Sequence, residues 1–272
     1  MAESPPKTEN VAAALKVFAV LESLAQDGQV SLADLANHTM TSKATAHRLL
    51  HTMVDLGYVE QDSATERFRL TLKLFTLGAR SLSGQSDLLR IADVQMGMLS
   101  RATGESINLG VMDSREQKVV YIHKYDSAYS LSMKSTLGLR NPLHSTSLGK
   151  ALLAWRPEAE VRERIGRSPL PQIAPRTLTD PEALIDQLRH FRAQGVAEEI
   201  EESEAGVRCL SVPVLDHLGR SIAAISIAFP IFRFEETRRH EYVAMLRAAG
   251  EAASHALGFD GSLTGPQAQG VI

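Results

Sequence analysis

The chain has 272 residues, of which 44% are hydrophobic and 22% charged, and its formal net charge is −3. This length is enough for two domains, because single domains usually hold about 100–200 residues. The slightly negative charge excludes a protein that coats nucleic acid by bulk electrostatic attraction, so any DNA contact requires a local basic patch. A single cysteine, Cys209, excludes an internal disulfide and is typical of a reducing compartment.

The sequence predicts no targeting or membrane-spanning segment. Residues 1–9 are polar and lack the apolar run of a signal peptide, and residues 261–272 are expected to be a second loose tail. The longest apolar stretch, 221–230, has the length of a strand and falls short of the roughly 18–20 residues that cross a bilayer. We therefore expect a cytoplasmic protein that does not associate with membranes.

Residues 10–70 have the pattern of a winged helix-turn-helix domain. Apolar residues recur at helical spacing, Ser31 opens a capping pattern, and Gly57 follows the third periodic segment as a left-handed terminator. The predicted elements are helices over 10–26, 31–40 and 42–56 and a hairpin of 58–60 and 67–70. Three short helices followed by a hairpin make a DNA-binding domain with a wing.

The third predicted helix has two distinct faces. The apolar face holds Ala46, Leu49, Leu50, Met53 and Leu56. The opposite face is polar and basic, and such a helix fits the DNA major groove, while arginines in the wing suit phosphate contacts. The candidate DNA-binding residues are Ser42, Lys43, Thr45, His47, Arg48, His51, Arg67 and Arg69. The alternative is that this face is an ordinary solvated surface of a structural helix.

After residue 70 the sequence pattern predicts a linker helix, 71–86, and a second domain, 87–258. Beyond a helix that ends near residue 103, strands and helices alternate and an antiparallel hairpin precedes the last helix. The expected strands are 107–112, 119–125, 131–134, 208–215 and 221–229, and the expected helices are 148–155, 158–165, 181–194 and 235–257. The predicted class is α+β.

Two segments of the second domain suit a small ligand. Residues 145–150, with Gly149, directly precede a helical run, and free amides at a helix start favour an anion such as a carboxylate, although the hydroxyls there also suit simple capping. In the last strand, alternation places Ser226 and Ala228 on a face with room for a ligand. Cys209 either lines the same space or is a small buried hydrophobe.

Enzymatic alternatives rest on weak motifs. Ser147 and Lys150 match the Ser-x-x-Lys pattern of serine acyl-enzymes, but the companion triplets are absent. Cys209 with His144 has no local signature of a nucleophile pair. The acidic stretch Glu198 to Glu204 is expected to be a solvated loop, with a role in binding ligand hydroxyls or metal as the alternative. We expect no enzyme activity, no cofactor and no metal.

Several motifs resemble those of the IclR family of bacterial regulators. They are Leu15-Lys16-Val17-Phe18, Ser42 to Arg48, Leu56-Gly57-Tyr58-Val59, Leu70 to Gly78 and Gly206 to Leu210, and the resemblance extends from about Asn10 to Gly258. It implies a winged helix-turn-helix joined by a linker helix to a GAF-like effector-binding domain with an antiparallel sheet. It also implies homodimers that pair through the N-terminal domains and linker helices, tetramers built as dimers of dimers, and palindromic operators in double-stranded DNA.

The resemblance further implies an effector pocket. Its positions in this sequence are Met133, Ser147, Leu148, Glu199, Cys209, Ser226 and Ala228. The chain departs from the family pattern at Glu199, where the family tends to have Asp, at Ala228, where it has Ser, and at Ser132, where it has Arg. Each departure changes the polar groups offered to the effector.

Four stretches are similar to a particular group of family members, those that repress pectin and hexuronate breakdown and answer to 2-keto-3-deoxygluconate. The stretches are 120–124, 140–143, 149–155 and 241–246. The resemblance implies a repressor that a small 2-keto carboxylate releases from DNA. Two alternatives stay open: an activator of the same family that responds to an aromatic or dicarboxylic acid, and a serine acyl-transferase that uses Ser147 and Lys150.

Overall fold

The computed structural model describes residues 12–81, 86–113, 115–133, 135–166 and 169–264. The chain forms two compact units, Met1–Gly84 and Gln85–Ile272. Each unit has its own hydrophobic core. The residues expected to form the linker fall on α4 (Leu72–Ser81), which belongs to the first unit, and on the start of α5 (Ser86–Thr103) in the second, while 82–85 lie outside the described residues.

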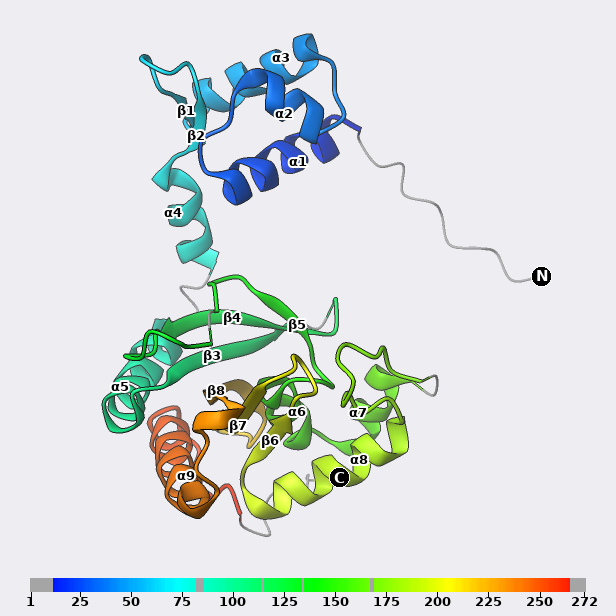
Figure 1. Ribbon diagram of the computed structural model, residues 1–272, viewed down its shortest axis with the longest axis vertical. Helices are drawn as coiled ribbons and strands as arrows, with labels where there is room; N and C mark the ends of the chain where they lie inside the picture. The colour runs from blue at the N-terminus through cyan, green and yellow to red at the C-terminus, as the bar shows by residue number, and fades with distance from the viewer. Residues whose placement is uncertain (1–11, 82–85, 114, 134, 167–168, 265–272) are drawn as a thin grey trace, which may run out of the picture. The chain divides into compact units, whose positions relative to one another are not determined.

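The first unit contains the three helices and the hairpin that the sequence predicts. They are α1 (Ala12–Asp27), α2 (Leu32–His38), α3 (Lys43–Asp55), β1 (Val59–Gln61) and β2 (Phe68–Leu70) (Figure 1). Ser31 and Ser42 cap the second and third helices, each accepting a hydrogen bond from the backbone amide three residues later. The expectation that Leu56 packs on the apolar face is wrong: it lies beyond the last turn of α3 and is 53% exposed.

The second unit is built on one antiparallel sheet of six strands. The strand order is β5-β4-β3-β8-β7-β6. The strands are β3 (Ser106–Asp113), β4 (Lys118–Tyr125), β5 (Arg140–Pro142), β6 (Ala197–Ile200), β7 (Val207–Leu215) and β8 (Ser221–Pro230). The sheet and its flanking helices give the α+β class that the pattern predicts.

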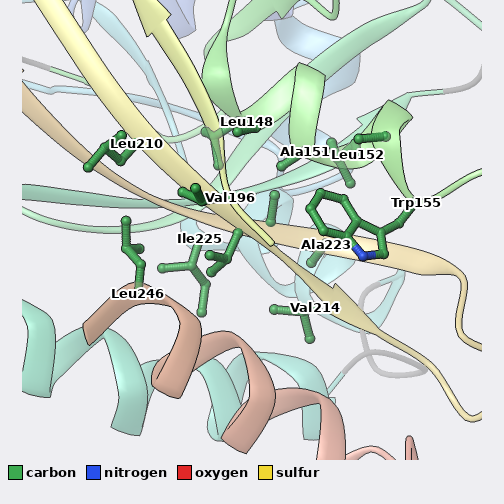
Figure 2. Close-up of a cluster of buried hydrophobic side chains, with 14 of the residues drawn as sticks. Leu148, Ala151, Leu152, Trp155, Val196, Leu210, Val214, Ala223, Ile225 and Leu246 are labelled. Carbon is green, nitrogen blue, oxygen red and sulfur yellow. The ribbon is translucent and has the colours of Figure 1, made fainter. Parts of the chain in front are cut away.

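Helices cover the sheet on both faces. Leu246, on α9 (Arg239–Ala256), and Leu148 and Ala151, on α6 (Ser147–Ala154), lie on opposite sides of the strands in Figure 2. Helix α5 packs beside α9, while α8 (Pro181–Gln194) contacts α6 and α7 (Glu158–Ile165). Helix α6 contacts β6, β7, β8 and β3, and the hydroxyl of Ser147 in its first turn lies 2.9 Å from the hydroxyl of Ser211 on β7.

Two predictions about the second unit need correction. Residues 131–133 form no strand; the carbonyls of Leu131 and Met133 accept hydrogen bonds from Arg233 and Ser106 side chains instead, and Lys134 lies outside the described residues. The last helix begins at Arg239, after two short 3₁₀ turns, and two short strands, β5 and β6, were not anticipated. In the part of the chain that the structure describes, no helix has the length and apolar character needed to cross a membrane.

Candidate DNA-binding surface and ligand cavity

Helix α3 presents a basic face outward. Ala46, Leu50 and Met53 are buried against the core of the first unit, while Lys43 and Arg48 are exposed. Within the described residues neither cation forms an ion pair, so both charges are available to an anionic partner. This division into a packed face and a basic face is the one that the helical spacing predicts.

The other candidates on α3 are partly engaged with one another. Ser42 accepts a hydrogen bond from the Thr45 amide at 3.2 Å, and the two hydroxyl oxygens lie 2.9 Å apart. His47 and His51 are both exposed, and their Nε2 atoms are 3.1 Å apart. All of these groups lie on the accessible side of α3, with Thr45 half-buried.

The two wing arginines are exposed but already have partners. Arg67 donates to the carbonyl of Gln29 at 3.1 Å. Arg69 pairs with Glu60 across the hairpin at 2.6 Å. Their charges are therefore less available than those of Lys43 and Arg48, because a neighbouring carboxylate screens Arg69 and a backbone contact restrains Arg67.

A cavity of about 80 Å³ lies between the sheet and the start of α6. Its lining residues are Asn108, Tyr121, Met133, Ser135, Leu139, Asn141, Thr146, Ser147, Glu199, Ser203, Glu204, Val207, Cys209, Ser226 and Ala228. Six of the eight predicted effector residues are among them: Met133, Ser147, Glu199, Cys209, Ser226 and Ala228. Segments that are far apart in the sequence therefore meet around one space.

The other two predicted effector residues are not in the cavity lining. Leu148 is 1% exposed and belongs to the hydrophobic core. Gly149 packs so closely on the preceding loop that an added Cβ would lie 2.2 Å from the carbonyl oxygen of Leu143. Its lack of a side chain lets α6 approach the backbone, which is a structural reason for glycine at this position.

Strand register explains why polar groups gather on this side of the sheet. Ser226 on β8 lies opposite Asn108 on β3 and opposite Ser211 on β7. Ala228 lies opposite Cys209, which in turn lies opposite Glu199 on β6. Since alternate residues of a strand share a face, these two rows form one polar wall.

Glu199 is a buried carboxylate in this wall. It is 1% exposed and accepts hydrogen bonds from the Ser203 hydroxyl at 2.7 Å and the Glu202 amide at 3.0 Å. Burial raises the pKa of Glu199, and the hydrogen bonds oppose this rise only in part. The expectation of a solvated acidic loop is therefore wrong for Glu199 and Glu202, which are both buried.

The enzymatic alternatives gain no support from the geometry. Burial raises the pKa of the Cys209 thiol, and the nearby Glu199 carboxylate raises it further, so the thiol stays protonated. His144 donates a hydrogen bond to the carbonyl oxygen of Pro171 at 2.9 Å and is not directed at Cys209. Lys150 is fully buried in an ion pair with Glu202, and Ser147 bonds to Ser211 at 2.9 Å. Ser147 has no hydrogen-bonded base among the described residues, and the hydrogen bond between Cys209 and Glu199 raises the pKa of the thiol, which disfavours the reactive thiolate.

Sequence reasoning did not identify several residues of the cavity lining, among them Asn108 and Asn141. Asn108, on β3, accepts a hydrogen bond from Ser135 at 2.5 Å, and Asn141 lies 3.5 Å from the Tyr121 hydroxyl. The alternation of polar and apolar residues along β3 was a usable signal for Asn108. Thr146 caps α6 by accepting from the Gly149 amide at 3.1 Å, which leaves the first two helical amides free of intrahelical partners.

Among the described residues, the cavity lining contains two carboxylates, on Glu199 and Glu204, and no lysine or arginine; Lys134, between Met133 and Ser135, lies outside them. The start of α6 offers positive potential to a bound anion, because Thr146 and Ser147 line the cavity and the N-terminal end of a helix carries a partial positive charge. The carboxylates, hydroxyls and amide side chains suit a ligand that also carries several hydroxyl groups.

Two family descriptions match the chain. "IclR helix-turn-helix domain" matches residues 13–63, and "Bacterial transcriptional regulator IclR C-terminal" matches residues 81–255. Together they account for the three-helix domain and for most of the second unit.

Relatives cover nearly the full length. The HTH-type transcriptional regulator KdgR of Escherichia coli is 46% identical over 258 residues, 95% of this chain and 97% of that protein. KdgR of Dickeya chrysanthemi is 45% identical over 259 residues, covering 95% of this chain and 84% of that protein. The crystal structure of the Thermotoga maritima IclR is 30% identical and superposes with a TM-score of 0.80, over 92% of this chain and all of that chain.

Proposed function

The chain belongs to the IclR family of bacterial transcriptional regulators, and from this premise we propose that it is a repressor of sugar-acid catabolism genes that a small 2-keto carboxylate releases from its operator. The observation that carries the proposal is the convergence of six predicted effector residues on one cavity in a protein 46% identical to KdgR. No catalytic role is assigned to Ser147, Lys150 or Cys209.

The recognition surface is the exposed face of α3. Arg48 and Lys43 have free charges and side chains long enough to reach guanine edges or phosphates in the major groove. The histidines and hydroxyls of the same face make shorter contacts, and the wing arginines contact the backbone. Because phosphate contacts release counterions, operator affinity falls steeply with salt.

The effector is held between α6 and the polar wall of the sheet. Its carboxylate accepts hydrogen bonds from the backbone amides of Ser147 and Leu148, which have no partner within α6. Its hydroxyl groups bond to Glu199, Asn108 and Ser226. 2-Keto-3-deoxygluconate carries both kinds of group and is the effector that we propose.

The DNA-binding unit pairs with a second copy of the chain. Apolar side chains that would normally be buried are more than half exposed on α1 and α4: Leu15, Phe18, Leu72, Phe75 and Leu77. Such an accumulation indicates a protein interface. A two-fold dimer, with tetramers as dimers of dimers, reads a palindromic operator in cytoplasmic DNA.

A mobility-shift assay tests the proposal. We expect the purified chain to retard a duplex from upstream of its own gene and 2-keto-3-deoxygluconate to release it. Thermal-shift screening with aromatic and dicarboxylic acids, together with a reporter gene, tests the alternative of an activator. A protein indifferent to every duplex would overturn the regulatory role, and one released only by an aromatic or dicarboxylic acid would overturn the choice of effector.

A further inference from the structure

His47 and His51 lie one turn apart on the exposed face of α3, and their ring nitrogens converge. The two Nε2 atoms are 3.1 Å apart and the ring centroids 4.3 Å apart. Both side chains are open to solvent. Because the helix holds both ring nitrogens at this distance and they face each other, one metal ion can bind to both of them.

The distance between the two nitrogens is suitable for chelating a transition-metal ion. Metal–imidazole bonds measure about 2.0–2.1 Å, so an ion bound to both nitrogens would subtend an angle of about 100°, between the octahedral and tetrahedral values. Histidines four residues apart on a helix are also the arrangement that holds zinc in helical metalloenzymes. We infer that His47 and His51 form a chelating site for a late divalent first-row ion such as Ni²⁺, Cu²⁺ or Zn²⁺.

The protein supplies only part of the coordination shell. Among the described residues, no third histidine, cysteine or carboxylate completes a cluster with the pair. Lys43 lies one turn before His47 and Asp55 one turn after His51, so opposite charges flank the site. Water fills the remaining positions, and the ion exchanges freely with solvent. Because the imidazoles must be neutral to bind, affinity falls in acid.

Occupancy of this site competes with operator binding, an inference that rests on the proposed role of α3. A metal-bound Nε2 can neither donate a hydrogen bond to a base edge nor accept one, and the hydrated ion occupies the space that the groove would fill. Thermodynamic linkage then requires that metal and operator lower each other's affinity by the same factor.

Calorimetry with Ni²⁺ alone tests the site. The full chain, without an affinity tag, is titrated at about pH 7.5, where imidazoles are mostly neutral. We expect about one ion per chain, and about tenfold or weaker binding in His47→Gln and in His51→Gln, since each loses one of two protein ligands. His217→Gln, which removes an exposed histidine elsewhere, is the control and should bind as the wild type does. Equal Ni²⁺ binding by all four proteins would overturn the site.

Mobility shifts with and without Ni²⁺ test the competition. In the wild type, Ni²⁺ should weaken binding of the upstream duplex by about fivefold or more, and chelator should restore it. In His51→Gln the ratio of the duplex affinities without and with Ni²⁺ should stay near one, whatever the DNA affinity of this variant. An unchanged or strengthened wild-type complex would overturn the competition. A duplex that is never bound, even without metal, would instead count against the proposed function.

Discussion

Lys150 and Glu202 form an ion pair inside the second unit, and the lysine side chain is completely buried. The pair joins α6 to the loop after β6, whose Glu202 amide also bonds to Glu199 at 3.0 Å. Two elements that line the ligand cavity are thus fixed to each other by one interaction between charges.

Replacing one partner of this pair should destabilise the protein strongly. Lys150→Met leaves the Glu202 carboxylate buried without its cation, and we expect a loss of about 3–5 kcal/mol in the free energy of unfolding. The double variant Lys150→Met with Glu202→Leu should lose less than Lys150→Met alone, because no unpaired charge remains. Urea unfolding of the three proteins measures both values, and a double variant less stable than the single one would contradict this account.

The free energy of unfolding should depend on pH through the protonation of Glu199. Its pKa is raised in the folded protein, so the native state holds the proton more tightly than the unfolded chain does. The free energy of unfolding should therefore fall as pH rises from about 4.3 through the raised pKa. Glu199→Gln should remove this component. Ser203→Ala deletes a hydrogen bond to the carboxylate, which should raise the pKa of Glu199 further. The pH range over which the free energy of unfolding falls should then extend to higher pH. Identical pH profiles in all three proteins would contradict the prediction.

Two arginines of the first unit should differ in their importance for DNA. Arg48 has no ion-pair partner among the described residues, whereas Arg69 is 2.6 Å from Glu60. Arg48→Ala should cost about 1–3 kcal/mol of operator affinity, and Arg69→Ala distinctly less. Filter binding at several salt concentrations measures both, and effector affinity should not change in either. A larger effect of Arg69→Ala would reverse the assignment of the contacts.

Gly149 should prove structural rather than ligand-binding. In Gly149→Ala the new methyl group meets the Leu143 carbonyl oxygen at 2.2 Å, and we expect a loss of about 2–3 kcal/mol or more in the free energy of unfolding. Gly250→Ala is the comparison: its methyl group lies 2.9 Å from a Val212 side-chain carbon and 3.0 Å from the Pro213 carbonyl oxygen, both longer than 2.2 Å, and helix propensity favours alanine, so the loss should be smaller. Normal stability of Gly149→Ala with loss of ligand binding alone would contradict this.

The exposed apolar residues of α4 should hold the dimer together. Phe75 is 74% exposed in the single chain, and Phe75→Asp would place a charge in the proposed interface. We expect sedimentation velocity to show monomers for this variant at concentrations where the wild type is dimeric. Gln61→Asp, an exposed change on β1, should leave the dimer intact. Dimeric Phe75→Asp would exclude α4 from the interface.

Local signals in the sequence were enough for the first unit and for the main strands of the second. Ser31 and Ser42 mark their helices because a cap acts on amides only three residues away. Alternation along β8 places Ser226 on the cavity side for a similarly local reason.

Long-range partners account for the failures. Residues 131–133 looked like a strand, but Ser106 and Arg233, both distant in the sequence, bind the carbonyls of Met133 and Leu131. The sequence predicted a solvated acidic loop, but Glu202 is buried in an ion pair with Lys150. These two residues are 52 positions apart in the sequence. No periodicity within the loop reveals such a partner.

The protonated thiol of Cys209 has a consequence for the conditions under which the cavity works. Peroxides, disulfides and alkylating reagents attack thiolates, and a thiol held in its neutral form reacts slowly with all of them. We therefore expect binding of the proposed effector to this cavity to withstand mild oxidants and alkylating reagents that inactivate proteins with exposed thiolates.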